Sequence, residues 1–127
     1  MRVAVKRIVV VFVLASCGCS RTPEAVIAGG KPASHWLEEA KKPDAKSRKK
    51  AVKELGHIGK ADPAAIPAVI AALKDFEPVV RREAALALLN LVDASEAADA
   101  LTEATHDKDP KVREYATEAL ARIRRER

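Results

Sequence analysis

The stretch from Asp109 to Ile123, which reads DPKVREYATEALARI, decides the fold because the chain carries it three times. The earlier copies read EPVVRREAALALLNL from Glu77 to Leu91 and DAKSRKKAVKELGHI from Asp44 to Ile58. Their starts are 33 and 32 residues apart, a period typical of stacked supersecondary units. Such units bury their apolar sides between neighbours and leave a long open face. The repeat therefore favours a binding role over a catalytic one.

Each copy keeps one side of an amphipathic helix, because four shared positions recur at steps of four, four and three residues. These positions are Ser47, Ala51, Leu55 and Ile58; Val80, Ala84, Leu88 and Leu91; and Val112, Ala116, Leu120 and Ile123. The alanine lets helices approach closely, and the leucine and the last aliphatic residue fill the contact. We therefore expect Leu55, Leu88 and Leu120 to be core residues.

Caps and breakers divide the rest of the chain into further helices. Pro67 either kinks the third helix or marks its true start, and Gly56 and Gly59 are interpreted as the end of the second. The six expected helices cover residues 35–42 after a Ser34 cap, 45–58 after Asp44, 63–75 after Asp62, 78–92, 94–106 after an Asp93–Glu96 capping box, and 110–124 after Asp109. The predicted fold class is all-α, a short α-α superhelix of three antiparallel helix pairs over residues 34–127.

These residues, together with Trp36-Leu37 and the run from Ile66 to Leu73, resemble HEAT repeats, in particular the bacterial phycobilisome-lyase-like group. Members of that family form right-handed superhelices and mostly bind proteins, and some relatives assist chromophore attachment. Two residues of the first copy depart from the pattern, since Ala45 replaces the usual proline and Ser47 the usual valine. The resemblance implies the fold and leaves the partner open.

The amino terminus has the order of a secretory signal, with basic residues first, an apolar run from Ile8 to Ala15, and small residues before Cys17. Eight apolar residues cover only about 12 Å as a helix, too little for a bilayer core. Leu14-Ala15-Ser16-Cys17 resembles the lipobox of bacterial lipoproteins, which implies removal of residues 1–16 and lipidation of Cys17. Cys19 is a weaker candidate because no aliphatic residue stands three before it. An ordinary secreted or signal-anchored protein is the alternative.

Residues 17–33 are expected to form a flexible lipidated tether, because Pro23, Gly29, Gly30 and Pro32 are turn formers. Docking of Ala25-Val26-Ile27-Ala28 on the first helix is the alternative. The expected location is the bacterial cell envelope, at the outer membrane or on a periplasm-facing membrane surface. Gly18 after the anchor, in place of the aspartate that favours inner-membrane retention in such proteins, is in keeping with the outer membrane.

Composition argues against several functions. The net charge of +5 falls to +2 without the first sixteen residues, which hold three basic residues and no acid, so a nucleic-acid partner is not expected. His35, His57 and His106 stand far apart, without the spacing of a metal site. No phosphate-binding loop and no nucleophile with a neighbouring base can be picked out. We expect no enzyme activity, cofactor, metal or small-molecule substrate.

One arginine recurs in every copy, as Arg48, Arg81 and Arg113, four residues after an acid. It can reach back to that acid or across to the next repeat, and a ladder of ion pairs between repeats is the favoured interpretation. A row of anion-binding arginines is the alternative.

The candidate partner-binding residues stand two positions past the apolar side of each repeated helix. They are Lys49, Lys53 and His57; Arg82, Leu86 and Asn90; and Glu114 and Glu118, with Arg122 completing the last set. One interpretation is a solvated face, and the other is a groove for a charged, extended segment of another envelope protein, with Leu86 as its apolar contact. Lys46, Lys49, Lys50 and Lys53 against anionic lipid headgroups are a further alternative.

The sequence thus predicts a non-catalytic protein-interaction scaffold, bound to the membrane through its lipid anchor. An accessory or lyase-like module that supports an enzyme or chromophore attachment is the alternative. A cytosolic or inner-membrane interaction module whose leader stays uncleaved is a third.

Overall fold

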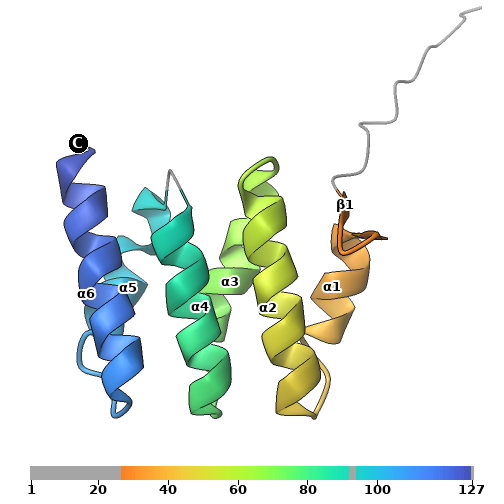
Figure 1. The fold of residues 1–127 in the computed structure, drawn as a ribbon, viewed down its shortest axis with the longest axis horizontal. Coiled ribbons are helices and arrows are strands. Elements are labelled where there is room, and N and C mark those ends of the chain that lie inside the picture. Colours follow the sequence, from red (N-terminus) through yellow and green to blue (C-terminus); the bar gives the residue numbers. More distant parts are fainter. Residues whose placement is uncertain (1–26, 92–93, 127) are drawn as a thin grey trace, which may run out of the picture.

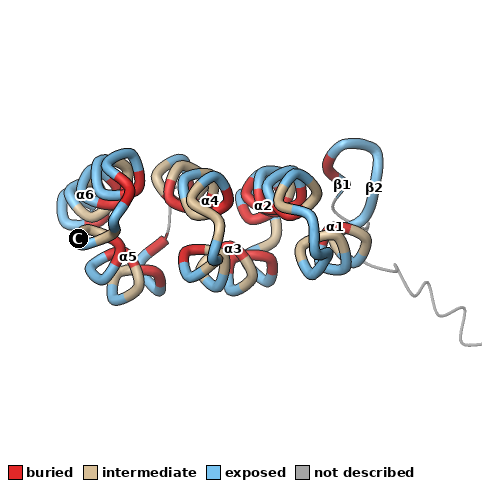
Figure 2. Tube along the Cα trace, turned by 90° about the horizontal axis from the view of Figure 1, so that it is seen from below, coloured by how far each residue is buried: buried red, intermediate tan, exposed pale blue. Residues whose placement is uncertain are grey.

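The computed structural model describes residues 27–91 and 94–126, which form three stacked helix pairs (Figure 1). The pairs are α1 (Ala33–Glu39) with α2 (Ala45–Gly59), α3 (Ile66–Ala72) with α4 (Pro78–Asn90), and α5 (Ala98–Ala104) with α6 (Pro110–Arg125). Helices α2, α4 and α6 lie side by side in one layer, and α1, α3 and α5 form the other (Figure 2). The predicted all-α superhelix of three pairs is confirmed.

Aspartates begin several helices as predicted. Asp44 accepts a hydrogen bond from the backbone N–H of Ser47 (2.8 Å), and Asp109 accepts from the N–H groups of Lys111 (2.9 Å) and Val112 (3.2 Å). Each satisfies donors that a helix start leaves free and places a negative charge at the positive end of the helix dipole. Asp93, the predicted cap of the fifth helix, lies outside the described residues.

Pro67 stands at the start of its helix and does not kink it. A 3-10 turn, η1 (Pro63–Ala65), follows Asp62, which accepts from the N–H of Ala64 at 3.0 Å, and α3 begins at Ile66. In the first helical turn a proline removes no helical hydrogen bond. The third pair repeats the plan, with η2 (Ser95–Ala97) before α5.

The short helices end earlier than predicted, at Glu39, Ala72 and Ala104 instead of near Lys42, Asp75 and His106. The residues that follow them form turns whose N–H groups bond three residues back, as Lys41 does to Glu38 (3.1 Å). Helix α1 also begins at Ala33, without a side-chain cap, so the Ser34 cap is wrong.

Gly56 lies inside α2 and does not end it, whereas Gly59 is the last residue of the helix, as predicted. A Cβ placed on Gly56 would stand 2.8 Å from the Cβ of Ala87 on α4, and one on Gly59 would stand 3.2 Å from Ile66. The two glycines therefore allow close packing between repeats, where larger residues would push the helices apart.

Part of the predicted flexible tether is ordered. Strands β1 (Ile27–Ala28) and β2 (Lys31–Pro32) form an antiparallel hairpin whose turn, Gly29-Gly30, has φ values of +56° and +72°. Such a turn needs two residues with positive φ, which glycine adopts without strain. The Nε1 of buried Trp36 donates to the carbonyl oxygen of Ala28 (2.8 Å) and ties the hairpin to α1.

The hairpin lies beside α2 in the layer of α2, α4 and α6 (Figure 2). It therefore covers the side of α2 that faces away from α4, as a preceding repeat would. We interpret it as the cap of this end of the stack, which a short array of repeats needs. The rest of the predicted tether, residues 17–26, lies outside the described residues.

The core follows the repeated apolar positions. They are almost fully buried except Ser47 and Leu120, which are half-buried. Trp36 points inward as expected from its place in the first helix, whereas Leu37 is 36% exposed. No helix within residues 27–91 and 94–126 has the length and apolar character that a membrane crossing requires.

Candidate functional site

The eight predicted partner-binding residues lie on the solvent side of α2, α4 and α6. All are exposed except Leu86, which is half-buried. We call this surface the second-helix face, and it comprises Lys49, Lys53, His57, Arg82, Leu86, Asn90, Glu114 and Glu118.

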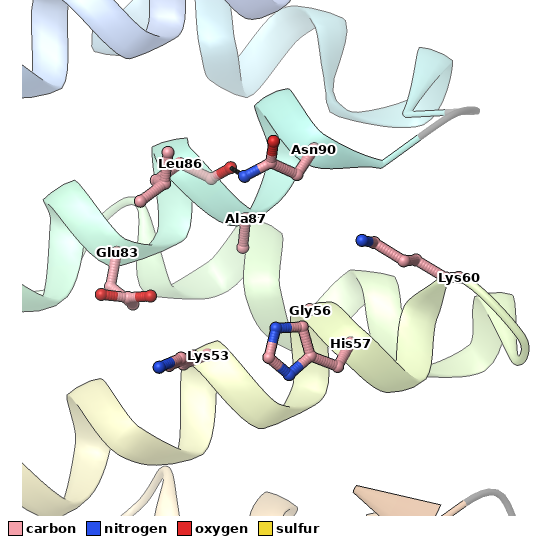
Figure 3. A pocket seen from close by; sticks show the side chains of 8 residues that line it. All are labelled: Lys53, Gly56, His57, Lys60, Glu83, Leu86, Ala87 and Asn90. Atoms are coloured by element: carbon pink, nitrogen blue, oxygen red, sulfur yellow. Dashed lines mark hydrogen bonds between the residues drawn. The ribbon is translucent and has the colours of Figure 1, made fainter.

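A groove of about 180 Å³ runs between α2 and α4 on this face (Figure 3). It brings together four of the predicted residues, namely Lys53 and His57 from α2 and Leu86 and Asn90 from α4. Lys49, Arg82, Glu114 and Glu118 do not line it. The predicted residues thus share one surface, and the groove hollows the part of it between α2 and α4.

Four lining residues were missed by sequence reasoning: Gly56, Lys60, Glu83 and Ala87. Gly56 and Ala87 are the smallest residues in the groove, and a Cβ on Gly56 would stand 2.8 Å from that of Ala87. The sequence does carry a signal for this contact, because a glycine inside a helical pattern indicates a close approach of backbones. The prediction of a helix end at Gly56 is wrong, because the residue lies inside α2.

The two walls of the groove differ in charge. Helix α2 contributes Lys53 and His57, Lys60 follows directly after it, and α4 contributes Glu83, Leu86 and Asn90 (Figure 3). His57 Nδ1 lies 3.6 Å from Glu54 Oε2, and Asn90 Nδ2 donates to the carbonyl oxygen of Leu86 (3.0 Å). Within the described part of the chain, Lys53, Lys60 and Glu83 form no ion pair. Three charged side chains at the groove are therefore available to a ligand.

Arg82 is engaged elsewhere, since its guanidinium binds both carboxylate oxygens of Asp109 at the start of α6. Hydrogen bonds from Arg82 and from the N–H groups of Val112 and Lys111 lower the pKa of Asp109 to about 2. Glu114 pairs with Lys111 on its own helix (2.8 Å). Arg82 thus links two repeats, and Glu114 links neighbouring turns of α6. The charges of both residues are already paired within the chain.

Arg48 and Arg81 form the predicted ladder by reaching across to the next repeat, whereas Arg113 forms no ion pair within the described residues. Arg48 binds both oxygens of Asp75 (2.8 and 3.1 Å), and Arg81 binds both oxygens of Asp107 (2.8 and 3.0 Å). The acids four residues before them are not their partners. Each arginine also donates to two carbonyl oxygens of the loop before its own helix, as Arg48 does to Lys42 and Pro43. One side chain therefore fixes two loops.

The aspartate partners were also missed, although the sequence repeats them two residues before the cap position, as Asp75 before Glu77 and Asp107 before Asp109. Asp75 Oδ1 and Asp107 Oδ1 accept from the backbone N–H groups of those residues, at 2.9 and 2.8 Å. The equivalent position in the first pair is Lys42, which pairs with Glu39 (2.6 Å). No repeat precedes it among the described residues, so no arginine there needs a partner.

The part of the chain that the structure describes holds no group of three or more His, Cys, Asp or Glu side chains arranged to bind a metal. Its buried side-chain nitrogen and oxygen atoms all have hydrogen-bond partners. Polar groups in the described core are thus satisfied internally. The lipidation candidate, Cys17, lies outside the described residues.

A family model for HEAT repeats matches residues 33–121, which include all six helices except the last turn of α6. No curated protein matched the chain. The matched range includes the ladder arginines, all residues that line the groove, and helices from all three pairs. The chain belongs to the HEAT-repeat family.

Proposed function

We propose that this chain is a lipid-anchored interaction scaffold of a bacterial cell envelope, which holds an extended segment of another envelope protein in the groove between α2 and α4. HEAT repeats generally act as protein-interaction scaffolds. The observation that carries the proposal is the groove itself, which joins unpaired charges of Lys53, Lys60 and Glu83 with the apolar side chain of Leu86. An apolar contact surrounded by polar groups is the usual anatomy of a protein interface.

The anchor at Cys17 would keep the groove near the membrane. Ten residue steps separate Cys17 from Ile27, the first residue of the hairpin, and span at most about 35 Å when extended. Confinement of this kind raises the effective concentration of the scaffold near partners in the same membrane, without any additional contact. The scaffold then needs only modest affinity for each partner.

The groove of the second-helix face gives no support to an accessory or lyase-like role. A module that binds a chromophore needs a pocket of roughly 300–1,000 Å³ with converging polar groups. The groove on the second-helix face measures about 180 Å³ and lies open between two helices. This alternative stays a prediction from resemblance.

Site-specific photocrosslinking in intact cells tests the scaffold. A photoreactive amino acid at position 86 should give a specific adduct with another protein, whereas the same group at Leu37, exposed on α1, should not. Equal yields of adduct at positions 86 and 37 would show that the crosslinks arise from random encounters and not from binding in the groove. Labelling with radioactive palmitate tests the anchor separately, since Cys17→Ser should abolish the label and Cys19→Ser should retain it.

A further inference from the structure

One side of α2 is a continuous basic ridge. We define the α2 ridge as Lys46, Lys49, Lys50, Lys53, His57 and Lys60, all of which are exposed. Most successive members stand three or four residues apart, and this spacing places them along one side of the helix. The ridge spans about 21 Å at the rise of an α-helix.

The positive charge of the ridge is largely uncompensated. Within the described residues, its contacts are His57 with Glu54 at 3.6 Å and Lys50 Nζ at 5.5 Å from the centre of the Trp36 ring. The buried cation of this helix, Arg48, has its own acid in Asp75. Adjacent lysines without acids repel one another, and an anionic ligand would relieve that repulsion.

Only Lys53, His57 and Lys60 of the ridge line the groove, and they form one of its walls. The opposite wall, on α4, offers Leu86, and the floor is made by Gly56 and Ala87 (Figure 3). An extended chain that lies in the groove points alternate side chains toward opposite walls. Side chains on one side would meet lysines, and those on the other would meet Leu86.

We propose that the groove recognises an extended protein segment in which acidic and apolar residues alternate, with the acids toward the α2 ridge and the apolar side chains toward Leu86. The proposal rests on the scaffold function above and adds the chemistry of its partner. About seven extended residues, at roughly 3.3 Å each, cover the length of the ridge. Glu83 on the α4 wall selects against an acid on that side.

A narrow segment fits this face better than an anionic membrane does. A flat bilayer laid over the second-helix face would also approach Glu114 and Glu118 of α6, which are exposed. It could not enter a groove whose floor is set by Gly56 and Ala87. A segment one chain wide contacts α2 and α4 alone.

The test measures binding of three fluorescent heptapeptides to the full chain in detergent. One alternates glutamate with leucine, the second holds the same residues in two blocks, and the third alternates lysine with leucine. The alternating acidic peptide should bind at least about tenfold more tightly than either of the others. Equal binding of the alternating and block peptides would overturn the proposal, because it would show attraction by charge alone.

Charge variants locate the peptide. Lys53→Glu with Lys60→Glu should weaken binding by about tenfold or more, and Lys53→Gln with Lys60→Gln should weaken it less. The matched control, Lys31→Glu with Lys108→Glu, changes two exposed lysines outside the groove by the same total charge and should stay within about twofold. Circular dichroism confirms that each variant remains folded. A control that loses as much affinity as the Lys53 and Lys60 variants would sink the assignment to the groove.

Two further measurements distinguish the proposed protein segment from a membrane and from a second copy of the chain. Stronger binding to phosphatidylglycerol vesicles than to the peptide, lost in the Lys53 and Lys60 variants, would replace the segment with a membrane. Self-association lost in those variants would replace it with a second copy of the chain. If Leu86 crosslinks a partner in cells but the alternating peptide does not bind, the scaffold stands and the acidic partner chemistry is wrong.

Discussion

Arg48 links the first two repeats from a position almost sealed from solvent. Its side chain is 6% exposed and that of Asp75 is 12% exposed. The ring of Phe76 covers the guanidinium, with 4.4 Å from the central carbon to the ring centre. Removing one partner of such a pair leaves the other without compensation, which costs more than the pair contributes. Arg113 holds the same place in the third pair, but it is exposed and binds only the carbonyl oxygens of Asp107 and Lys108.

We therefore expect Arg48→Ala to lower the melting temperature by roughly ten degrees, and Arg113→Ala by a few degrees at most. Thermal unfolding followed by circular dichroism at pH 7 measures both. Equal effects of the two substitutions would mean that the ion pair to the next repeat adds nothing to the loop contacts that both arginines make.

Asp109 gives the fold a dependence on acid pH. Its pKa is about 2 in the folded chain, below the ordinary value of 3.8, because Arg82 and two helix N–H groups bind its charged form. A lowered folded pKa adds stability that is fully present above the unfolded value and is lost as pH falls toward the folded value. The pKa of Asp107 is also lowered, since burial, which opposes ionisation, is outweighed by Arg81 and by the N–H of Asp109.

The melting temperature should therefore fall as pH drops from about 4 to about 2, and Asp109→Asn should show a smaller fall over that window. Asparagine keeps an oxygen that can cap α6 and removes only the titrating charge. Thermal melts at half-unit pH steps give the comparison. If the variant and the parent chain lose stability in parallel, other carboxylates carry the acid sensitivity.

At the scale of the helix, small residues set the distance between α2 and α4. Alanine at position 56 would gain up to about 1 kcal/mol of helix propensity over glycine, but its Cβ would stand 2.8 Å from Ala87. Overpacking of this kind costs about 1–3 kcal/mol. We expect Gly56→Ala to be destabilising, and Ala87→Gly to rescue part of the loss in the double variant.

Urea unfolding of the two single variants and the double variant gives the coupling free energy between the positions. A coupling near zero would show that the helices move apart without cost, and the floor of the groove would then not be rigid. The groove binding of the alternating peptide, measured on the same variants, reports whether the spacing also sets recognition.

The elements also show how far sequence reasoning reached. Periodicity and aspartate caps located the long helices, because those signals are local to each helix. The hairpin from Ile27 to Pro32 was predicted as tether, since two glycines and a proline carry no apolar pattern of their own. What orders it is a distant contact, the hydrogen bond from Trp36 to Ala28. The same limit applies to the groove, because its floor depends on how closely two helices pack.

At the scale of the whole molecule, the two ends of the stack differ. The hairpin covers the outer side of α2, while nothing in the described residues covers the outer side of α6. The leucines at the same position of the three copies differ accordingly. Leu55 and Leu88 are fully buried, whereas Leu120 is only half-buried. The repeated leucine position does not show this difference, because the three leucines occupy identical positions in their copies. In a linear stack, each repeat depends on the neighbours that it contacts.

This arrangement predicts unequal costs for the same substitution. Leu55→Ala and Leu88→Ala should each lower the free energy of unfolding by about 2–5 kcal/mol, because each leaves a cavity between packed layers. Leu120→Ala should cost less than about 2 kcal/mol, because part of that side chain already meets water. Urea titrations with a common m-value measure the three losses. A loss at position 55 as small as that at position 120 would show that the hairpin does not serve as a cap, since α2 would then be as open on its outer side as α6.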